Sequence, residues 1–427
     1  MTKRRVARPR EILPLLGRPD RSLTRAQRRL ARAASIEDLR AMARRRTPSA
    51  VFDYTDGAAM SESTLERSRD AYARVEFTPR VLRDVSQVDL STMIMGEPST
   101  LPFAFAPTGF TRMMNHEGEA AVAQVAGARG IPYGLSTLGT TSIEALAQSA
   151  PGTRRWFQLY VSRDRAAAES LMVRADAAGY DTLILTVDTA VGGIRRREVR
   201  NGLTIPPQLR LSTMADMARY PRWWFNVLTT EPLQFASLSS TGGTVGDLLT
   251  RIFDPGITPA DITWIRDHWS GRLILKGVQS REDAILAADL GVDGIVLSNH
   301  GGRQADRANV PLEILPSVVA AVGERVEVAI DGGIMSGTDI AAALAFGARF
   351  VLVGRAYLYG LMAGGRDGVA RAVDILEKEL RTTMQLIGAT SVAELREAEV
   401  RLRASVETSR GSEAGAASLT CLVTMRR

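Results

Sequence analysis

The sequence predicts an α/β fold: a (β/α)8 TIM barrel with an N-terminal helical region and a long insert after strand 4. Three observations lead to this prediction. From about residue 100 onward, short and nearly continuous apolar runs alternate with segments of helical periodicity, as expected for parallel strands that are buried on both faces. Eight such runs follow one another, which favours a closed barrel over an open doubly wound sheet. They recur mostly every ~22–32 residues, an ordinary length for one βα unit.

The predicted strands share an aliphatic, β-branched composition. They are residues 101–110, 131–137, 155–161, 181–189, 272–278, 293–302, 325–333 and 349–357. The segments between them, such as GEAAVAQVAGARG (118–130), have helical periodicity and end at glycine, a common helix stop. We expect a helical region at 35–85 before the barrel, and helices after the last strand to about residue 405.

The chain is expected to divide into three parts. Residues 1–34 form a basic N-terminal arm, residues 35–405 form the barrel, and residues 406–427 form a flexible tail rich in Ser, Ala and Gly. The arm is either solvated or in contact with an anionic surface, such as nucleic acid or a membrane.

The positive charge of the chain is concentrated at its N-terminus. Residues 1–50 carry a net charge of +11, which leaves −4 for the rest of a chain whose formal net charge is +7. A slightly acidic body argues against a nucleic-acid-binding domain. We therefore expect no nucleic-acid partner.

The insert after strand 4 is the largest departure from a regular barrel. About 80 residues separate the fourth and fifth strands, roughly three times a normal crossover. We expect an insert over about 203–262, on the face where the loops that follow strands lie. It contains Trp223, Trp224 and Phe225 beside Arg222. These aromatic residues either pack inside the insert or form an exposed anchor for a membrane or a partner.

Composition excludes several kinds of site. The single cysteine, Cys421, excludes a disulfide framework and a cysteine-based zinc site. Three histidines leave little room for a histidine-rich metal site, so no metal is expected. No apolar run of about 18 residues is present, which argues against a transmembrane helix. We expect a cytoplasmic protein, with peripheral contact at the inner face of the cell membrane as a further hypothesis.

Each predicted strand carries polar or glycine residues at its end. In a barrel the carboxyl ends of the strands meet on one rim, where active sites lie. In strand order these residues are Pro107, Thr108, Gly109, Ser136, Gln158, Tyr160, Thr186, Asp188, Lys276, Ser298, His300, Arg303, Asp331, Gly332, Gly333, Gly354 and Arg355. Their convergence on one rim predicts an active site.

His300 is the predicted catalytic base. It follows a strand and lies between Asn299 and two glycines, rather than on an apolar helix face. Asp188, at the end of the fourth strand, is suited to orient the imidazole and to stabilise its protonated form.

Two arginines are expected at the same mouth. Arg303 and Arg195 follow these strand ends closely, and paired arginines suit a carboxylate substrate. Arg196 and Arg197 continue the run after Arg195, a pattern that is also typical of a solvated face.

The turns after the seventh and eighth strands contain glycines, which are typical of the phosphate site of barrel enzymes. Arg355 would add charge and a bidentate fork there. The alternative is that these glycines only make tight turns. Lys276 is expected inside the top of the barrel, where a cation would stabilise an anionic cofactor.

Several motifs together resemble one family. They are SNHGGRQ (298–304), LTVDT (185–189), FQLY (157–160), APTGF (106–110), LILKGV (273–278) and the DGG…GR pair of turns. This combination is similar to the FMN-dependent L-2-hydroxy acid dehydrogenases and oxidases over about residues 35–400. Within that family the resemblance is greatest to the bacterial respiratory L-lactate dehydrogenases. It rests there on FDYTDGA (52–58), TGFTRMM (108–114), RWWFNVLTTEPLQFASL (222–238), GIMSG (333–337) and GRAYLYGLMAGG (354–365).

The resemblance implies FMN as the cofactor and gives roles to matched residues. FMN would be held by Pro107, Thr108, Gly109, Ser136, Gln158, Thr186, Lys276, Ser298, Asp331, Gly332, Gly333, Ile334, Met335, Gly354 and Arg355. The substrate would contact Tyr54, Tyr160, Arg195, His300 and Arg303. His300, Asp188, Tyr160 and Lys276 would form the catalytic set. In such enzymes the histidine takes the hydroxyl proton, while a hydride or its equivalent passes from C2 to the flavin.

The activity implied is oxidation of L-lactate to pyruvate, with a quinone or cytochrome as electron acceptor, in a homo-oligomer expected to be a tetramer. The alternatives are an oxidase or dehydrogenase of another L-2-hydroxy acid, mandelate- or glycolate-like, and a non-catalytic barrel. Three residues depart from the wider family. Met335 replaces an arginine near the phosphate, Leu138 replaces the tryptophan of glycolate oxidases, and Gly109 replaces alanine over the flavin. The substrate wall is therefore expected to differ.

Overall fold

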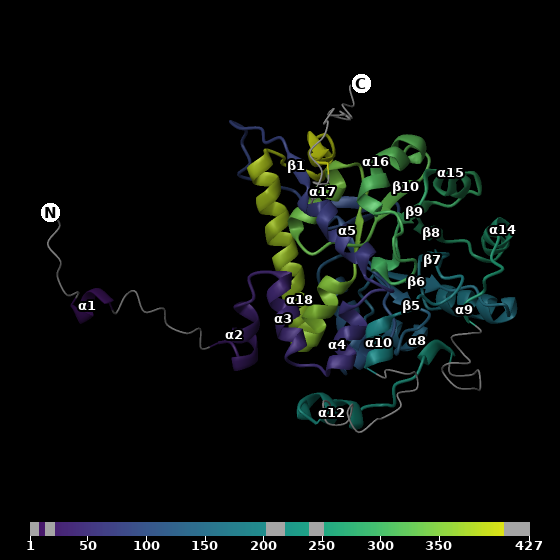
Figure 1. Cartoon of the computed structure of the whole chain (residues 1–427), viewed down its shortest axis with the longest axis horizontal. Coiled ribbons are helices and arrows are strands. Elements are labelled where there is room, and N and C mark those ends of the chain that lie inside the picture. The colour runs from purple at the N-terminus through teal and green to yellow at the C-terminus, as the bar shows by residue number, and fades with distance from the viewer. Residues whose placement is uncertain (1–7, 13–21, 202–217, 239–251, 405–427) are drawn as a thin grey trace, which may run out of the picture.

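Eight parallel strands close into a barrel, as the sequence predicts (Figure 1). The computed structural model describes residues 8–12, 22–201, 218–238 and 252–404. Around the barrel the strand order is β10-β11-β4-β5-β6-β7-β8-β9. The strands are β4 (Phe103–Phe105), β5 (Tyr133–Ser136), β6 (Arg155–Leu159), β7 (Thr182–Thr186), β8 (Arg272–Val278), β9 (Gly294–Leu297), β10 (Glu327–Ile330) and β11 (Val351–Val353). Each lies within one of the predicted runs.

The barrel interior is filled by side chains. Trp156, Ile184, Ile274, Val296 and Leu352 are buried together in a cluster separate from the main core. Alternate strand residues point inward, so large and small side chains from different strands share this space. A hairpin of β2 (Thr92–Ile94) and β3 (Glu97–Ser99) contributes Ile94 to the same cluster. The interior is therefore a packed core, and any ligand site lies at its rim.

Helices follow the strands and cover the barrel. They are α6 (Thr111–Met114), α7 (Gly118–Ala128), α8 (Ile143–Ser149), α9 (Arg165–Ala177), α14 (Pro259–His268), α15 (Arg281–Asp289), α16 (Pro311–Val322), α17 (Gly337–Ala345), α18 (Arg355–Ile387) and α19 (Val392–Arg396). The side-chain oxygens of Ser142, Ser280 and Ser336 cap α8, α15 and α17 by accepting backbone N–H groups. The long α18 is interrupted at Gly364 and Gly365, whose backbone angles are not helical.

From α2 onward, the N-terminal region packs onto one side of the barrel unit. It contains α1 (Pro9–Ile12), α2 (Arg25–Ala31), α3 (Ile36–Arg44), α4 (Ser49–Asp56), α5 (Ser63–Ala73) and β1 (Val75–Phe77). Within the predicted basic arm, α2 packs against α18: Leu30 is buried, and Gln27 donates to Asp367 at 3.1 Å. Strand β1 pairs antiparallel with β12 (Val400–Leu402), which joins the two ends of the barrel unit. The predicted tail, residues 406–427, lies outside the described residues.

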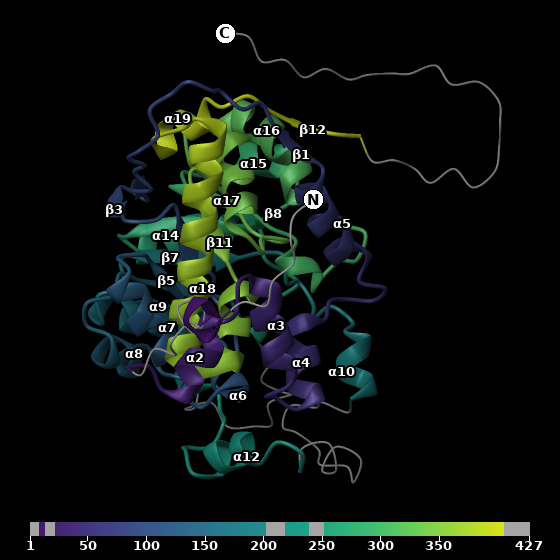
Figure 2. The same ribbon diagram turned by 90° about the vertical axis from the view of Figure 1, so that its left-hand side faces the viewer.

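Between β7 and β8 the described chain forms α10 (Arg196–Arg200), α12 (Pro221–Leu228), η2 (Ala236–Leu238) and the barrel helix α14. Residues 202–217 and 239–251 of the predicted insert lie outside the description. Because α14 begins at Pro259, the last residues assigned to the insert belong to a barrel helix. Both views place α12 at the end of the molecule opposite α19 (Figures 1 and 2).

The structure decides between the two interpretations of the aromatic cluster residue by residue. Trp223 is 9% exposed, and its Nε1 donates to the carbonyl of Met113 at 2.9 Å, so it packs internally. Trp224 is partly buried against the core. Phe225, by contrast, is 67% exposed. The prediction that Trp223 is part of an exposed surface anchor is therefore wrong, because the face of α12 that carries Trp223 packs on α6. Among the described residues, no helix is long and apolar enough to cross a bilayer.

Candidate functional site

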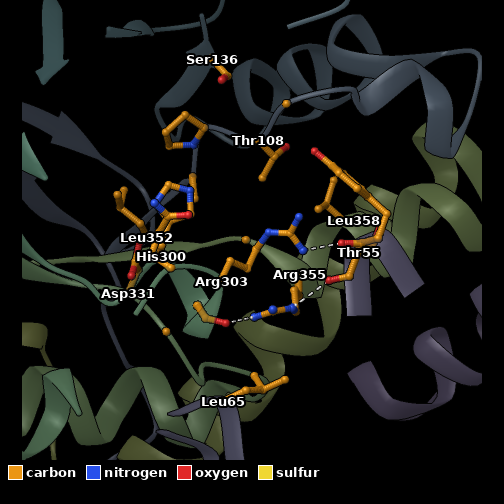
Figure 3. A pocket seen from close by; sticks show the side chains of 18 of the residues that line it. Thr55, Leu65, Thr108, Ser136, His300, Arg303, Asp331, Leu352, Arg355 and Leu358 are labelled. Carbon is orange, nitrogen blue, oxygen red and sulfur yellow. Dashed lines mark hydrogen bonds between the residues drawn. The ribbon is translucent and has the colours of Figure 1, made fainter. Parts of the chain in front are cut away.

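A cavity opens at the carboxyl ends of the strands (Figure 3). Most of the predicted site residues line it. They are Tyr54, Pro107, Thr108, Gly109, Ser136, Tyr160, Arg195, Lys276, His300, Arg303, Asp331, Gly332, Gly333, Ile334, Met335, Gly354 and Arg355. The other four predicted residues, Gln158, Thr186, Asp188 and Ser298, do not line it but lie next to residues that do. The polar rim predicted from the strand ends is therefore one site.

His300 and Asp188 form the predicted pair. The Nδ1 atom of His300 lies 3.0 and 3.3 Å from the two carboxylate oxygens of Asp188. The Asp188 side chain is 2% exposed. Burial alone would raise the pKa of Asp188, but the neighbouring His300 and Lys276 outweigh it, so this pKa lies below its ordinary value. Asp188 thus stays a carboxylate, and Nε2 is left as the ring nitrogen for a substrate proton.

The turn that carries His300 is held in an unusual conformation. His300 has a φ of 57°, and Gly301 and Gly302 also have positive φ values. A Cβ at Gly302 would lie 2.9 Å from the backbone nitrogen of Leu65, so the helix α5 demands glycine there. The N–H of His300 donates to Ser298 Oγ at 3.0 Å. The short helical turn η3 (His300–Gly302) therefore fixes the imidazole at the cavity edge.

Lys276 is a buried cation with two polar neighbours. Its Nζ donates to Ser298 Oγ at 2.9 Å and lies 3.1 Å from an Asp331 carboxylate oxygen. Burial would lower the pKa of Lys276, but Asp331 and Asp188 raise it above its ordinary value. In the register of the barrel Lys276 pairs with Thr186. The top of the barrel thus presents a fixed positive charge.

The two predicted substrate arginines converge on a third residue. Arg303 Nη2 donates to Glu198 Oε1 at 3.1 Å, and Arg195 Nε lies 3.3 Å from the same oxygen. Arg303 also donates to the carbonyl of Tyr54, and its guanidinium lies 4.7 Å from the centre of the Tyr54 ring. Burial and the nearby Arg195 lower the pKa of Arg303. Two arginines this close repel each other unless an anion lies between them. The Glu198 carboxylate neutralises part of their positive charge.

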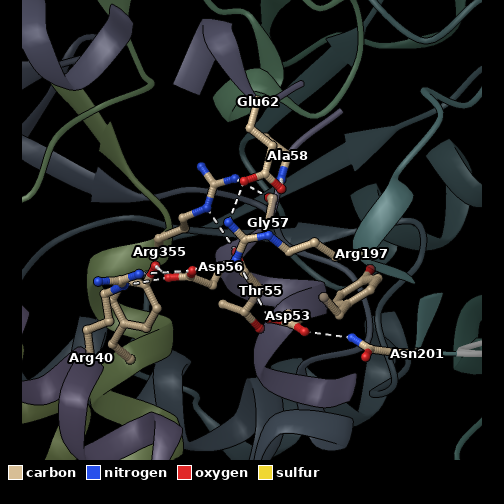
Figure 4. Close-up of polar contacts among 12 residues, drawn as sticks. Arg40, Asp53, Thr55, Asp56, Gly57, Ala58, Glu62, Arg197, Asn201 and Arg355 are labelled. Carbon is tan, nitrogen blue, oxygen red and sulfur yellow. Dashed lines mark hydrogen bonds and ion pairs between the residues drawn. The ribbon is translucent and has the colours of Figure 1, made fainter. Parts of the chain in front are cut away.

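Arg197 occupies a different place from its neighbour Arg195. It donates to Asp56 at 3.0 Å and pairs with Glu62, in a cluster that also contains Arg40 (Figure 4). The interpretation of the arginine run as a solvated face is therefore wrong for Arg197. The cluster fixes the C-terminal end of α4, which borders the cavity.

Asp56 is the centre of this cluster. It is 3% exposed and accepts hydrogen bonds from Arg40, Arg197 and the Tyr359 hydroxyl. Burial would raise the pKa of Asp56, but these donors lower it to about 2, against an ordinary value of 3.8. A carboxyl with a depressed folded pKa stabilises the fold above about pH 4, and this contribution is lost as pH falls through about 2.

The Asp56→Asn variant is expected to lower the free energy of unfolding by about 2–3 kcal/mol near neutral pH, from the size of this pKa shift. Equilibrium urea unfolding of both proteins measures it. The difference between them should shrink as the pH falls from about 4 toward 2. Glu37→Gln is the control, because Glu37 pairs with Arg40 at the surface with a side chain 54% exposed, and such pairs contribute little. Equal stability of wild type and Asp56→Asn at neutral pH would contradict this account.

Arg355 lines the cavity, but most of its hydrogen-bond donors already have acceptors within the protein. Its Nε, Nη1 and Nη2 donate to the carbonyls of Thr55, Gly301 and Gly57 at 2.9, 2.8 and 2.7 Å (Figures 3 and 4). A guanidinium has five N–H groups, so about two remain for a ligand. Arg355 therefore ties the α4 end to the barrel as well as charging the cavity.

Sequence reasoning missed several residues of the site. Glu198, Arg69, Thr55, Phe253 and Gln304 contact the predicted residues or line the cavity. Glu198 could have been found from the sequence, because an acidic residue three positions after an arginine at the start of a helix can pair with that arginine, here Arg195. Arg69 had none, since it lies on α5, far from the strand ends in the sequence.

Comparisons with known proteins indicate one family. Residues 43–402 match the family described as FMN-dependent dehydrogenase. A Mycobacterium tuberculosis protein, assigned provisionally as an L-lactate dehydrogenase, is 52% identical over 392 residues, which cover 92% of this chain and 95% of that protein. An L-lactate dehydrogenase of Caulobacter vibrioides is 42% identical over 371 residues, with 85% and 96% covered.

Solved structures are also similar to this chain. The monotopic membrane protein (S)-mandelate dehydrogenase matches with a TM-score of 0.84 and 36% identity, covering 87% of this chain and 100% of that one. A mandelate oxidase matches with a TM-score of 0.76 and 38% identity, with 86% and 98% covered.

The chemistry of the cavity fits FMN. Gln158 Nε2, Thr186 Oγ1 and Asp331 Oδ1 are buried and have no hydrogen-bond partner among the described residues. Buried polar atoms without partners are rare, and they indicate where a polar ligand belongs. The edge of a flavin ring offers both donors and acceptors, and the glycines of the β10 turn let backbone N–H groups approach a phosphate.

Proposed function

This chain belongs to the FMN-dependent dehydrogenase family, and on that premise we propose that it oxidises L-lactate to pyruvate and passes the electrons to a quinone or cytochrome. The observation that carries the proposal is the His300–Asp188 pair beside two arginines in one cavity. A base next to a carboxylate-binding cluster is what a 2-hydroxy acid requires, because its hydroxyl and carboxylate are on adjacent carbons. The names of the L-lactate dehydrogenases that it resembles support the choice of lactate.

Arg303 and Arg195 bind the substrate carboxylate in this proposal. Both lie within 3.3 Å of one Glu198 oxygen, so they already face a common anion position. Arg303 is also fixed by the Tyr54 carbonyl and ring. Such a preorganised fork orients C2 of the substrate as well as binding its carboxylate.

His300 accepts the hydroxyl proton at Nε2, because Nδ1 is held by Asp188. The imidazolium that forms is stabilised by the buried Asp188 carboxylate. When bound, FMN supplies the acceptor for the two electrons that leave C2 as a hydride or its equivalent. Conversion of lactate to pyruvate would thus leave the hydroxyl proton on His300, while the C2 hydrogen and two electrons would leave for the cofactor. Tyr160 lines the same cavity beside Arg195 and completes the substrate site.

The residues that would hold FMN are those that the family resemblance matches. They are Pro107, Thr108, Gly109, Ser136, Gln158, Thr186, Lys276, Ser298, Asp331, Gly332, Gly333, Ile334, Met335, Gly354 and Arg355. Lys276 would place its charge beside the flavin, which favours an electron-rich cofactor.

A larger hydroxy acid, such as mandelate, is the second candidate. A Cβ at Gly109 would lie 3.0 Å from Leu138 Cβ, and both residues line the cavity. The absence of that methyl group widens this part of the wall. The mandelate enzymes among the similar structures favour the same alternative.

The experiment is rapid anaerobic mixing of the purified enzyme with L-lactate, (S)-mandelate or glycolate, followed by exposure to oxygen or to a soluble quinone. We expect the highest rate of flavin reduction per unit concentration with L-lactate, and faster reoxidation by the quinone than by oxygen. A preference for (S)-mandelate would show that mandelate, and not lactate, is the substrate. Rapid reoxidation by oxygen would show that the enzyme is an oxidase.

A quinone acceptor lies in a membrane, and we propose that the enzyme binds the cytoplasmic membrane surface peripherally. Phe225 and Leu228 of α12 are 67% and 75% exposed. Arg222, at the start of the same helix, is exposed too. Exposed apolar residues beside a cation suit the headgroup region. The resemblance to a monotopic membrane enzyme supports this proposal. The tetramer implied by the family resemblance stays a prediction.

The protein is expected to float with anionic liposomes at low salt and less so at high salt. Phe225→Ala with Leu228→Ala should weaken flotation without loss of FMN. Trp223→Ala is unsuitable, since it would damage internal packing. Leu386→Ala is the matched control, because Leu386 is an exposed leucine on α18. A wild type that ignores anionic liposomes at low salt would refute the membrane proposal.

A further inference from the structure

Helix α5 closes one side of the cavity. A Cβ at Gly333, in the turn after β10, would lie 2.6 Å from the carbonyl oxygen of Ser68. Asn299, in the turn after β9, donates to Ser68 Oγ at 3.0 Å. Leu65, one turn earlier on α5, lines the cavity on the side of Arg355, opposite Ser136 (Figure 3). One face of α5 is therefore in contact with the turn after β9 and with the turn after β10.

Arg69 follows Ser68 on this helix and lines the cavity. Its Nε and Nη2 atoms are buried, and neither has a hydrogen-bond partner in the part of the chain that the structure describes. Buried guanidinium donors without acceptors are costly, so this arrangement indicates an anion that completes the site.

The surroundings of Arg69 are already positive. Burial lowers the pKa of Arg355 to about 10, and the nearby Arg303 and Arg69 lower it as well. Each nitrogen of Arg355 donates to a backbone carbonyl. Met335, which lines the same cavity from the turn after β10, adds no positive charge. The unpaired donors of Arg69 are thus the ones most available to an anion.

We propose that Arg69 binds the phosphate group of FMN, as the cation that makes up for the uncharged Met335. The phosphate would lie against the glycine turn after β10, where Arg69 and Arg355 approach from α5 and α18. A phosphate monoester carries nearly two negative charges, which suits two neighbouring arginines. This inference rests on FMN as the cofactor and not on which hydroxy acid is oxidised.

The test compares flavins that differ only in the phosphate. The dissociation constants of FMN and riboflavin are measured by flavin fluorescence, with wild type and Arg69→Ala stripped of flavin. We expect Arg69→Ala to weaken FMN binding by about 10- to 100-fold, the usual effect of losing a charge-assisted pair. Riboflavin binding should stay unchanged.

Two further variants make the result specific. Arg67→Ala removes the same charge from the same helix, but this side chain is 46% exposed and lies 3.9 Å from Glu313, so FMN binding should not change. Met335→Arg added to Arg69→Ala should restore most of the lost affinity, because it returns a cation to the turn.

Three results would overturn the inference. FMN binding that is unchanged in Arg69→Ala would show that Arg69 does not contact the phosphate. An equal loss for FMN and riboflavin would show that Arg69 only supports packing. A wild type that binds neither flavin would instead refute the family-based function itself, so the two failures are distinguishable.

Discussion

The His300→Gln variant is expected to keep FMN bound and to slow flavin reduction by L-lactate by about 10²–10⁴-fold, the usual effect of losing a general base. Glutamine cannot accept the hydroxyl proton, and it cannot be stabilised in a protonated form by Asp188. The cofactor should remain, because the imidazole, held by Asp188, lies at the cavity edge, and the bond from the backbone N–H of residue 300 to Ser298 Oγ does not depend on the side chain. Rapid anaerobic mixing with excess L-lactate measures the rate directly.

His268→Gln is the control, since His268 lies on the exposed side of α14, away from the cavity. It should leave the reduction rate unchanged. A near-normal rate in His300→Gln would show that another group takes the proton. Because His300 has a positive φ, retention of FMN in the variant also checks that the turn has kept its conformation.

The Arg303→Lys variant is expected to raise KM strongly and to lower kcat, with a combined loss in kcat/KM of about 10²-fold or more. Lysine keeps the charge but loses the planar fork. Here the fork has two tasks, because one nitrogen donates to Glu198 and another to the Tyr54 carbonyl. The single ammonium nitrogen of a lysine cannot replace two separate guanidinium nitrogens at both acceptors and also orient a carboxylate in the same plane. Steady-state kinetics separate the effects on KM and kcat.

Arg196→Lys is the matched control, because Arg196 belongs to the same arginine-rich stretch and is exposed. Its kinetics should equal those of the wild type. An unchanged KM in Arg303→Lys would remove Arg303 from the substrate site.

The sequence predicts well those features that depend on residues close together in the chain. The buried runs define the strands, because a strand in a parallel sheet is apolar on both faces. Strand order around the barrel then follows chain order, so the polar residues at the strand ends meet without further information. The Asp188–His300 contact is an example: the two residues are 112 positions apart, yet the barrel topology alone brings them to one rim.

The features that the sequence could not predict depend on how separate layers dock. Ser68 bonds with Asn299 across 231 positions, and contacts of this kind between α5 and the strand-end turns bring Arg69 to the cavity. Two of the three carbonyls to which Arg355 donates, those of Thr55 and Gly57, come from the end of α4, some 300 positions earlier in the chain. No periodicity encodes such pairings.

The aromatic cluster shows the same limit on a single helix. Trp223 and Phe225 are two positions apart, and their composition is equally suited to packing or to exposure. The contact of Trp223 with Met113, across 110 positions, decides which face is buried. The sequence alone offered both interpretations for the whole cluster.

The most direct test of the central claim is anaerobic titration of the purified, flavin-containing enzyme with L-lactate and, separately, with D-lactate, followed by the flavin absorbance. If His300 is the base and Arg303 and Arg195 bind the carboxylate, as we propose, only one hydroxy acid enantiomer can place its C2 hydrogen toward the cofactor. We predict full reduction at about one L-lactate per flavin, with pyruvate formed in the same amount, and no reduction by D-lactate. An enzyme whose bound flavin stays oxidised in L-lactate, (S)-mandelate and glycolate alike would contradict the account.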